Sequence, residues 1–446
     1  MNFRKDILPV ALSVLGILIV SLSAPSVMEV FLRHDVFSRI YEVEEIAEPK
    51  IYRDLAPNTP ITEIVEIRPY KYSNIYVKTV YSKLKLYADE ELIYTCGEEG
   101  SYLGALMDPP TLISIVPLPE TATKLRFEYI SPSQRTAMVI PPLIGGKGLA
   151  LMNHLLLQNG ALLILSTTMI LFGAALIVVA LISLKRLAIL YHYIHLGSFA
   201  LLLGSWGLGE CNATAFFIPY PSMLHLMTYI GFISFVIPLL QYGIDILKPR
   251  RRWPIQGMIA VLSGVLLLSV ILQFTGVTAM HGWLKLYQLL NGIAALILGL
   301  TTVVERFRYK NPIAKRFSKP FAILFCGALL EYWNYTIRFT QILSMFLMTS
   351  ALLFTIFLGS IGMVIVREKF REIEESRRAV EKLHFYRKMS HDLRTPLTRI
   401  STNIQIANMG EQTDHQRLGK SQEEIMRISE MIDAALTEGD EREGRI

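Results

Sequence analysis

The chain has 446 residues, of which 52% are hydrophobic and 18% charged, and its formal net charge is +6. Ordinary soluble domains carry about 25% charged residues, so the composition excludes a soluble protein and indicates a membrane protein with polar parts attached. The Lys and Arg residues lie beside apolar stretches, so their excess indicates membrane topology and gives no sign of nucleic-acid binding.

The first predicted element is an apolar stretch from Ile7 to Leu22, which follows two basic residues. It is short for a membrane-spanning helix, which needs about 20 residues. Ser21 and Ser23 fit the small residues that precede the cleavage point of a signal peptide. Residues 1–24 are therefore either a signal peptide or an N-terminal anchor helix. Both interpretations place the following segment outside the membrane.

Residues 29–145 no longer form one long apolar stretch, and their pattern predicts an extracellular β-sandwich sensor domain. Short runs that favour strands are separated by turn residues, as in antiparallel sandwiches of about 100 residues. These runs are Thr62–Ile67, Asn74–Val80, Leu84–Tyr87, Leu112–Val116 and Lys124–Ile130. The many tyrosines here could line a groove for a carbohydrate-like ligand, although tyrosine also simply suits pleated surfaces. Cys96 and Cys211 could pair if both face outside, but the three cysteines, with Cys326, have no metal-ligand spacing.

Residues 160–366 predict a domain of seven transmembrane helices, because each of seven apolar stretches approaches the length that crosses a bilayer. The stretches are Ala161–Leu184, Leu187–Leu208, Ser222–Leu247, Ile255–Val277, Leu284–Val304, Phe321–Arg338 and Ile342–Val366. Lys and Arg gather after the first, third, fifth and seventh stretches. This alternation predicts a multi-pass plasma-membrane protein with its C-terminal part in the cytoplasm.

Two ionisable residues interrupt the sixth apolar stretch. Glu331 and Arg338 are seven residues apart and share one helix face. Such residues inside a membrane suggest a functional role, although a paired structural role is as plausible here. Glu210, at the outer end of the second stretch, could contact the sandwich or pair with Arg338.

The apolar stretches end at Val366, and a charged helical pattern follows. Residues 367–385 carry a partial apolar stripe that predicts a signalling coiled coil. Residues 378–438 predict two amphipathic helices joined by a turn, ahead of a polar tail at 439–446. Two such helices cannot bury their apolar faces well alone, so we expect a homodimer in which two hairpins form a four-helix bundle.

A reactive segment lies inside this helical pattern, in the sequence Ser-His-Asp-Leu-Arg-Thr-Pro-Leu. The neutral imidazole of His391 can attack phosphorus, and Asp392 can hold the proton of the other ring nitrogen and orient the ring. Thr395 lies about one turn later, where its hydroxyl could position a water. Pro396 removes a backbone donor and would kink or loosen the helix beyond the reactive turn.

With this segment, the chain resembles bacterial sensor histidine kinases of the seven-transmembrane receptor type with diverse intracellular signalling modules. The resemblance implies a jelly-roll sensor outside the cell and a dimerisation and phosphoacceptor domain inside it. It implies that His391 is the phosphoacceptor, that Asp392 activates it and that Thr395 serves phosphatase action. It further implies ATP, with Mg²⁺, as phosphoryl donor and a response-regulator aspartate as acceptor.

The sequence as given carries no ATP-binding segment after the hairpin, so it represents either a truncated kinase or a kinase whose ATP-binding domain acts in trans. An alternative is a receptor or adaptor without kinase activity, or a phosphatase-only partner that relies on another chain. A transporter is a weaker alternative, because it leaves the hairpin and the sandwich unexplained. The extracellular ligand and the cognate response regulator cannot be named from these residues.

Overall fold

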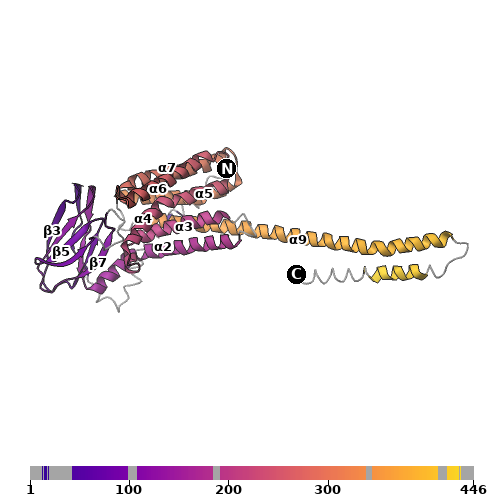
Figure 1. The fold of residues 1–446 in the computed structure, drawn as a ribbon, viewed down its shortest axis with the longest axis horizontal. Coiled ribbons are helices and arrows are strands. Elements are labelled where there is room, and N and C mark those ends of the chain that lie inside the picture. Colours follow the sequence, from indigo (N-terminus) through magenta and orange to yellow (C-terminus); the bar gives the residue numbers. More distant parts are fainter. Residues whose placement is uncertain are drawn as a thin grey trace. The chain divides into compact units, whose positions relative to one another are not determined.

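The computed structural model describes residues 13, 15–17, 19, 43–98, 108–183, 191–337, 344–409, 419–430 and 432. The chain divides into two compact units, Met1–Gly359 and Ser360–Ile446, which are described separately below (Figure 1). Most of the predicted signal peptide or anchor at residues 1–24 lies outside the described residues.

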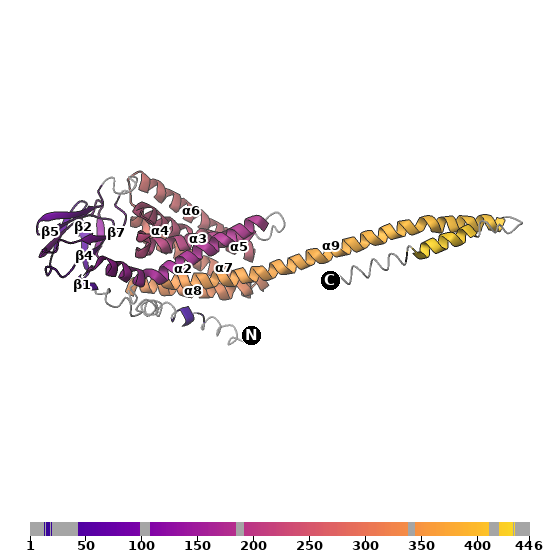
Figure 2. The ribbon, with the colours of Figure 1, turned by 90° about the horizontal axis from the view of Figure 1, so that it is seen from below.

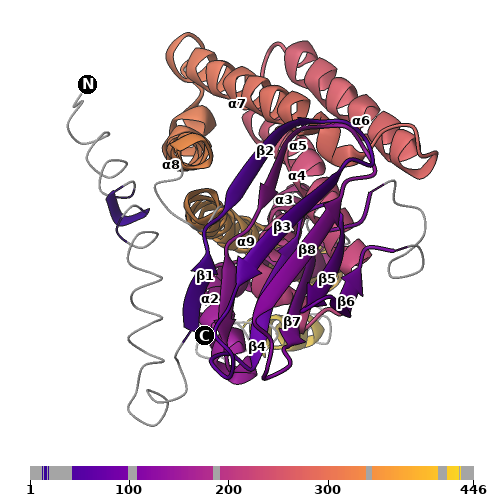
Figure 3. The same ribbon diagram turned by 90° about the vertical axis from the view of Figure 1, so that its left-hand side faces the viewer.

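The first unit begins with antiparallel sheets, whose strands are seen from the sandwich side in Figure 3. One sheet has the order β1-β10-β4-β7, a second has the order β3-β8-β5-β6, and β2 pairs with β9. The strands in the described residues are β1 (Val43–Ala47), β2 (Lys50–Leu55), β3 (Pro60–Glu66), β4 (Asn74–Thr79), β5 (Lys83–Ala88), β6 (Glu91–Cys96), β7 (Leu112–Pro117), β8 (Lys124–Ile130), β9 (Arg135–Ile140) and β10 (Leu143–Gly146).

The sandwich forms because its strands alternate between buried apolar and exposed polar side chains. In β8, Leu125, Phe127 and Tyr129 point inward and join one hydrophobic core with residues of both four-stranded sheets, such as Ile75 of β4. The five predicted strands are confirmed as β3, β4, β5, β7 and β8. The sequence analysis did not predict β1, β2, β6, β9 and β10.

Helices make up the rest of the first unit, as seen in Figures 1 and 2. They are α2 (Gly148–Ser183), α3 (His192–Glu210), η3 (Asn212–Phe216), α4 (Pro221–Ser234), α5 (Val236–Leu247), α6 (Trp253–Phe274), η4 (Met280–Trp283), α7 (Leu284–Phe307), α8 (Pro312–Ile337) and the start of α9 (Met345–Met409). Among the described residues, four helices are long and apolar enough to cross a membrane: Gly148–Ile182, Pro221–Leu247, Trp253–Phe274 and Met280–Phe307. Met345–Gly359 is a shorter apolar helix.

Helices α2 and α3 approach each other closely because glycines face one another across their contact. A Cβ atom built on Gly173 would lie 2.6 Å from the carbonyl oxygen of Gly197, and one built on Gly197 would lie 2.6 Å from the carbonyl oxygen of Gly173. Real Cβ atoms do not approach backbone so closely, so any larger residue would push the helices apart.

Two basic loops meet at one end of the helices. The backbone N–H of Arg250, in the loop between α5 and α6, donates to Glu305 of α7 over 2.9 Å. The Arg250 guanidinium also lies over the ring of Tyr309, in the loop between α7 and α8, with its carbon 4.5 Å from the ring centroid. The Asn311 side chain donates to the carbonyl oxygen of Leu247 over 2.9 Å. These contacts hold the two most basic loops side by side.

The second unit contains the C-terminal part of α9 and a helical segment at residues 419–430. The first of these carries the predicted coiled coil of residues 367–385, and both lie in the predicted hairpin of residues 378–438. Arg399 of α9 forms an ion pair with Glu424 of the second segment, with 3.1 Å between nitrogen and oxygen. The helical hairpin is therefore present, while the coiled coil and the four-helix bundle stay predictions.

Candidate functional site

His391 lies within α9, where no backbone break interrupts the helix. Its side chain is 84% exposed, and its Nδ1 lies 3.4 Å from Oδ1 of Asp392. This spacing is loose for a direct hydrogen bond but places the carboxylate beside the ring nitrogen. The other ring nitrogen, Nε2, therefore remains available to a reacting group.

The residues around His391 differ in exposure. Thr395 is exposed and Pro396 is buried. The helix assignment continues through Pro396, and Thr398 donates its hydroxyl to the carbonyl oxygen of Arg394 over 2.8 Å. The Arg394 carbonyl lies two positions before Pro396, in the helical turn where the proline supplies no backbone N–H donor. The kink at Pro396 stays a prediction.

A groove of about 930 Å³ lies between α9 and the second helical segment. It is lined on one side by Thr395, Thr398 and Thr402 and on the other by Lys420 and Arg427. The Arg399–Glu424 ion pair crosses from one helix to the other beside this groove. Two helices leave such a gap when further helices are needed to complete their core.

Apolar side chains of this unit lie in solvent. Exposed large apolar residues of this unit include Ile373, Val380, Leu383, Leu397, Ile404 and Ile425. Ile400 is the buried exception. A row of exposed large apolar residues on one hairpin indicates a protein-interaction face.

Comparison with known proteins finds one match. Residues 381–444 match the family model described as the His Kinase A (phospho-acceptor) domain. The match supports a histidine kinase family and a phosphoacceptor role in two-component signalling, and domains of this kind typically form dimers and pair with response regulators. No curated protein and no solved structure matches the chain.

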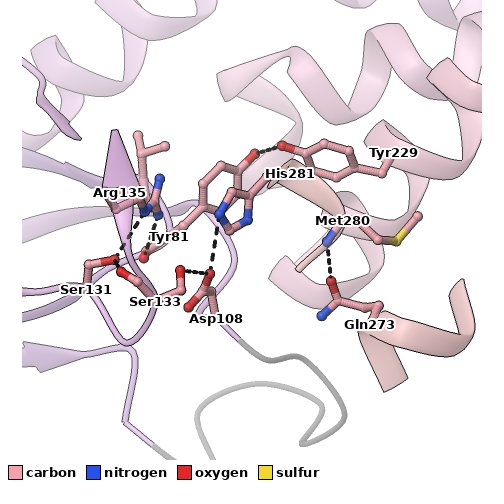
Figure 4. Close-up of polar contacts among 10 residues, drawn as sticks. Tyr81, Asp108, Ser131, Ser133, Arg135, Tyr229, Gln273, Met280 and His281 are labelled. Atoms are coloured by element: carbon pink, nitrogen blue, oxygen red, sulfur yellow. Dashed lines mark hydrogen bonds and ion pairs between the residues drawn. The ribbon is translucent and has the colours of Figure 1, made fainter. Parts of the chain in front are cut away.

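A second polar site lies where the sandwich meets the helices of the same unit (Figure 4). Tyr81, in the turn after β4, stacks on His281 of η4 with ring centroids 4.6 Å apart and planes 7° apart. It meets His225 of α4 edge-on, with centroids 5.5 Å apart. Its hydroxyl forms a hydrogen bond with the hydroxyl of Tyr229. One side chain of the sandwich is therefore seated among three rings of the helices.

Arg135 of β9 holds this turn in place. Its guanidinium donates to the carbonyl oxygens of Val80 over 3.2 Å and of Tyr81 over 2.8 Å, and to the Ser131 hydroxyl over 3.1 Å. Tyr81 has a φ of 53°, in the left-handed region that non-glycine residues rarely adopt. The two carbonyl bonds to a buried charge stabilise this unusual backbone.

Asp108 completes the junction from the other side. Its Oδ2 accepts a hydrogen bond of 2.7 Å from the Ser133 hydroxyl and lies 3.4 Å from Nε2 of His281. Burial raises the pKa of Asp108 above its usual range, and burial likewise lowers the pKa of Arg135. The junction thus gathers ionisable groups from segments more than 100 residues apart in the chain.

This junction was not predicted from the sequence. From the sequence, Tyr81 was predicted only as one of the tyrosines that could line a sugar groove and Asp108 only as a turn residue. His225 and His281 were given no role. The hypothesis on Glu331 and Arg338 has a different outcome. Glu331 is buried and accepts backbone hydrogen bonds at the start of α9, while Arg338 lies outside the described residues.

Proposed function

We propose that this chain is a membrane sensor histidine kinase of the seven-transmembrane receptor type, which carries phosphate on His391 for transfer to a response-regulator aspartate. The observation that carries the proposal is the exposed His391–Asp392 pair on a continuous helix within the matched phosphoacceptor region. In this role Asp392 orients the ring and faces the proton on Nδ1, while the lone pair of Nε2 attacks the γ-phosphorus of ATP. The bond between the γ-phosphorus and the β–γ bridging oxygen breaks, and ADP leaves with that oxygen.

The phosphoryl donor is ATP, with Mg²⁺, held by an ATP-binding domain that acts on the hairpin in cis or in trans. Thr395 would position a water during dephosphorylation, because it is exposed about one turn from His391 and lines the groove. The exposed apolar stripe supports a homodimer in which two hairpins complete one four-helix bundle.

The proposed topology has the sandwich outside the cell and His391 inside. Support comes from the two basic loops that meet near Glu305, because positive loops are typical of the cytoplasmic side. The sandwich contacts the opposite set of loops, through Tyr81 and through a hydrogen bond of 2.8 Å from Lys78 to Asn212 of η3. In the proposed topology, α3, α8 and the start of α9 complete the set of spans.

The proposed signal path begins in the sandwich. An extracellular ligand would shift the turn after β4, and Tyr81 would transmit the shift to α4 and η4 because its ring contacts His225 and His281. A change in the helices would then alter the access of the ATP-binding domain to His391. The ligand could be carbohydrate-like.

The test is labelling of the full chain with [γ-³²P]ATP, Mg²⁺ and a histidine-kinase ATP-binding domain added in trans. Wild type should gain acid-labile, base-stable label, and His391→Gln should gain none, since Gln lacks the nucleophile. His384→Gln is the matched control, because His384 is exposed on the same helix, and it should label like wild type. Equal label in His391→Gln and wild type would contradict the proposal.

A further inference from the structure

The start of α9 lies beside α8 (Figures 2 and 3), and Phe346 of α9 and Ile323 of α8 belong to one hydrophobic cluster. Met345, Phe346, Met348 and Ala351 have almost no exposed surface. The same helix continues to His391. Whatever fixes the first turn of α9 therefore fixes one end of the helix that carries the proposed phosphoacceptor.

Glu331 of α8 supplies that fixed point. Its Oε1 accepts from the backbone N–H of Ser344 over 2.7 Å, and its Oε2 accepts from Phe346 over 3.0 Å and from Leu347 over 3.4 Å. The first N–H groups of a helix have no partner within the helix, and the helix dipole favours negative charge there. A carboxylate from a neighbouring helix thus caps α9.

The cap is enclosed. The Glu331 side chain is buried, and the buried side chain of Asn334, one turn later on α8, hydrogen-bonds the same carboxylate. Because little water can replace the backbone donors of α9, a shift of α9 along its axis would leave the buried carboxylate without those three partners. Such a shift is far less favourable than one in which both helices move together.

A second contact, one turn earlier on α8, fixes the spacing of the two helices. A Cβ atom built on Gly327 would lie 2.1 Å from Oγ of Ser350 and 3.0 Å from the carbonyl oxygen of Phe346. Gly327 and Glu331 are four residues apart and so lie on one face of α8. Both therefore act on the same two turns of α9.

We propose that Glu331 is a positioning residue that locks the start of α9 to α8, so that the two helices move as one body during signalling. The expected effect on His391 rests on the proposed function, whereas the contact between Glu331 and α9 does not depend on it. The signal then reaches α9 through movement of the α8–α9 pair against the other helices, and not through sliding of α9 past α8.

Hydrogen exchange on the purified full chain in lipid nanodiscs tests the lock directly. In Glu331→Ala the amides of Ser344, Phe346 and Leu347 should exchange about tenfold faster than in wild type, because their acceptor is gone. Glu331→Gln should give a smaller increase, since it retains one acceptor oxygen and loses the charge. Unchanged exchange of these amides in Glu331→Ala would overturn the proposal.

Glu305→Gln is the matched control, because Glu305 is a buried glutamate of α7 that also accepts a backbone N–H, but from Arg250. It should leave exchange at residues 344–347 unchanged. If it speeds exchange there as much as Glu331→Gln does, the effect is general loosening and the proposed lock is wrong.

A labelling arm separates this inference from the proposed function. With the ATP-binding domain in trans, Glu331→Gln should change the rate of His391 labelling at least threefold, while Glu305→Gln should match wild type. An unchanged rate in Glu331→Gln would reject the positioning role although His391 still accepts phosphate. No label on wild type would reject the proposed function, and the exchange result would still decide the lock.

Discussion

The two ends of α9 have opposite surroundings. Near its start, Phe346 and Phe354 are fully buried, whereas Val380 and Leu383 are 62% and 69% exposed. Both ends carry apolar residues at helical spacing, but charged residues surround them only after Val366. The difference teaches that the first unit completes its core within one chain, while the second presents a core face that another chain can cover.

The same contrast holds for the charged residues. In the first unit Arg135, Asp108 and Glu331 are buried and hydrogen-bonded, so each has a fixed position. In the second unit the ion pairs of α9, such as Arg377–Glu381, connect exposed side chains. Exposed pairs contribute little to stability, so the hairpin gains little from them.

The largest expected effect comes from the apolar residues of α9. Phe346→Ala should lower the free energy of unfolding by about 3–5 kcal/mol, as large-to-small changes in cores do. Leu383→Ala should change the stability of the isolated chain by less than about 0.5 kcal/mol, as expected for an exposed residue, but should weaken self-association. Thermal unfolding and analytical ultracentrifugation in detergent measure the two effects. Equal destabilisation by both variants would contradict the difference in burial between the two ends of α9.

An intermediate effect is expected at buried and exposed arginines. Arg135→Ala removes three hydrogen bonds from a charged group and should cost about 2–3 kcal/mol. Arg399→Ala removes an exposed ion pair and should cost about 0.2–1 kcal/mol. Chemical denaturation followed by tryptophan fluorescence and circular dichroism compares them. A larger loss at Arg399 than at Arg135 would contradict the contrast between the units.

The smallest expected effect is the pH dependence at Asp108. Burial raises the pKa of its carboxyl in the folded chain above the usual 3.8, so the folded state favours the protonated form. The resulting stability is present below pH 3.8 and is lost as the pH rises through the raised pKa. Asp108→Asn should remove this loss, so its melting temperature relative to wild type should increase as the pH rises from 3.8 through the raised pKa. A relative melting temperature that stays constant with pH would show that Asp108 does not titrate in this way.

Much of the fold follows from local patterns in the sequence. Strand β8 was predicted with its observed bounds because Lys124–Ile130 alternates between apolar and polar residues. Strand β2 was missed because its pattern is mostly exposed and it pairs only with β9, so little alternation is imposed on it. Strand β10 was missed because Leu143–Gly146 ends in two glycines, which strands disfavour.

The candidate sites also differ in how far they could be predicted from local sequence patterns. The histidine segment could be predicted because all its chemistry lies within six consecutive residues, His391–Pro396. The Tyr81 junction could not be predicted, because it joins residues 144–200 positions apart and depends on a left-handed turn at Tyr81. Glu331 was recognised as unusual, but its partners are backbone groups, which no sequence pattern reveals.

The contact between Gly173 and Gly197 has a consequence for natural variation. Since a methyl group at either position would meet backbone, neither position should accept any other amino acid in functional relatives of this chain. Positions on the outer faces of α6 and α7, such as Leu267 and Leu300, should instead exchange freely among leucine, isoleucine, valine and phenylalanine. A collection of related genes would then show a conserved contact between α2 and α3 and variable outer faces on α6 and α7.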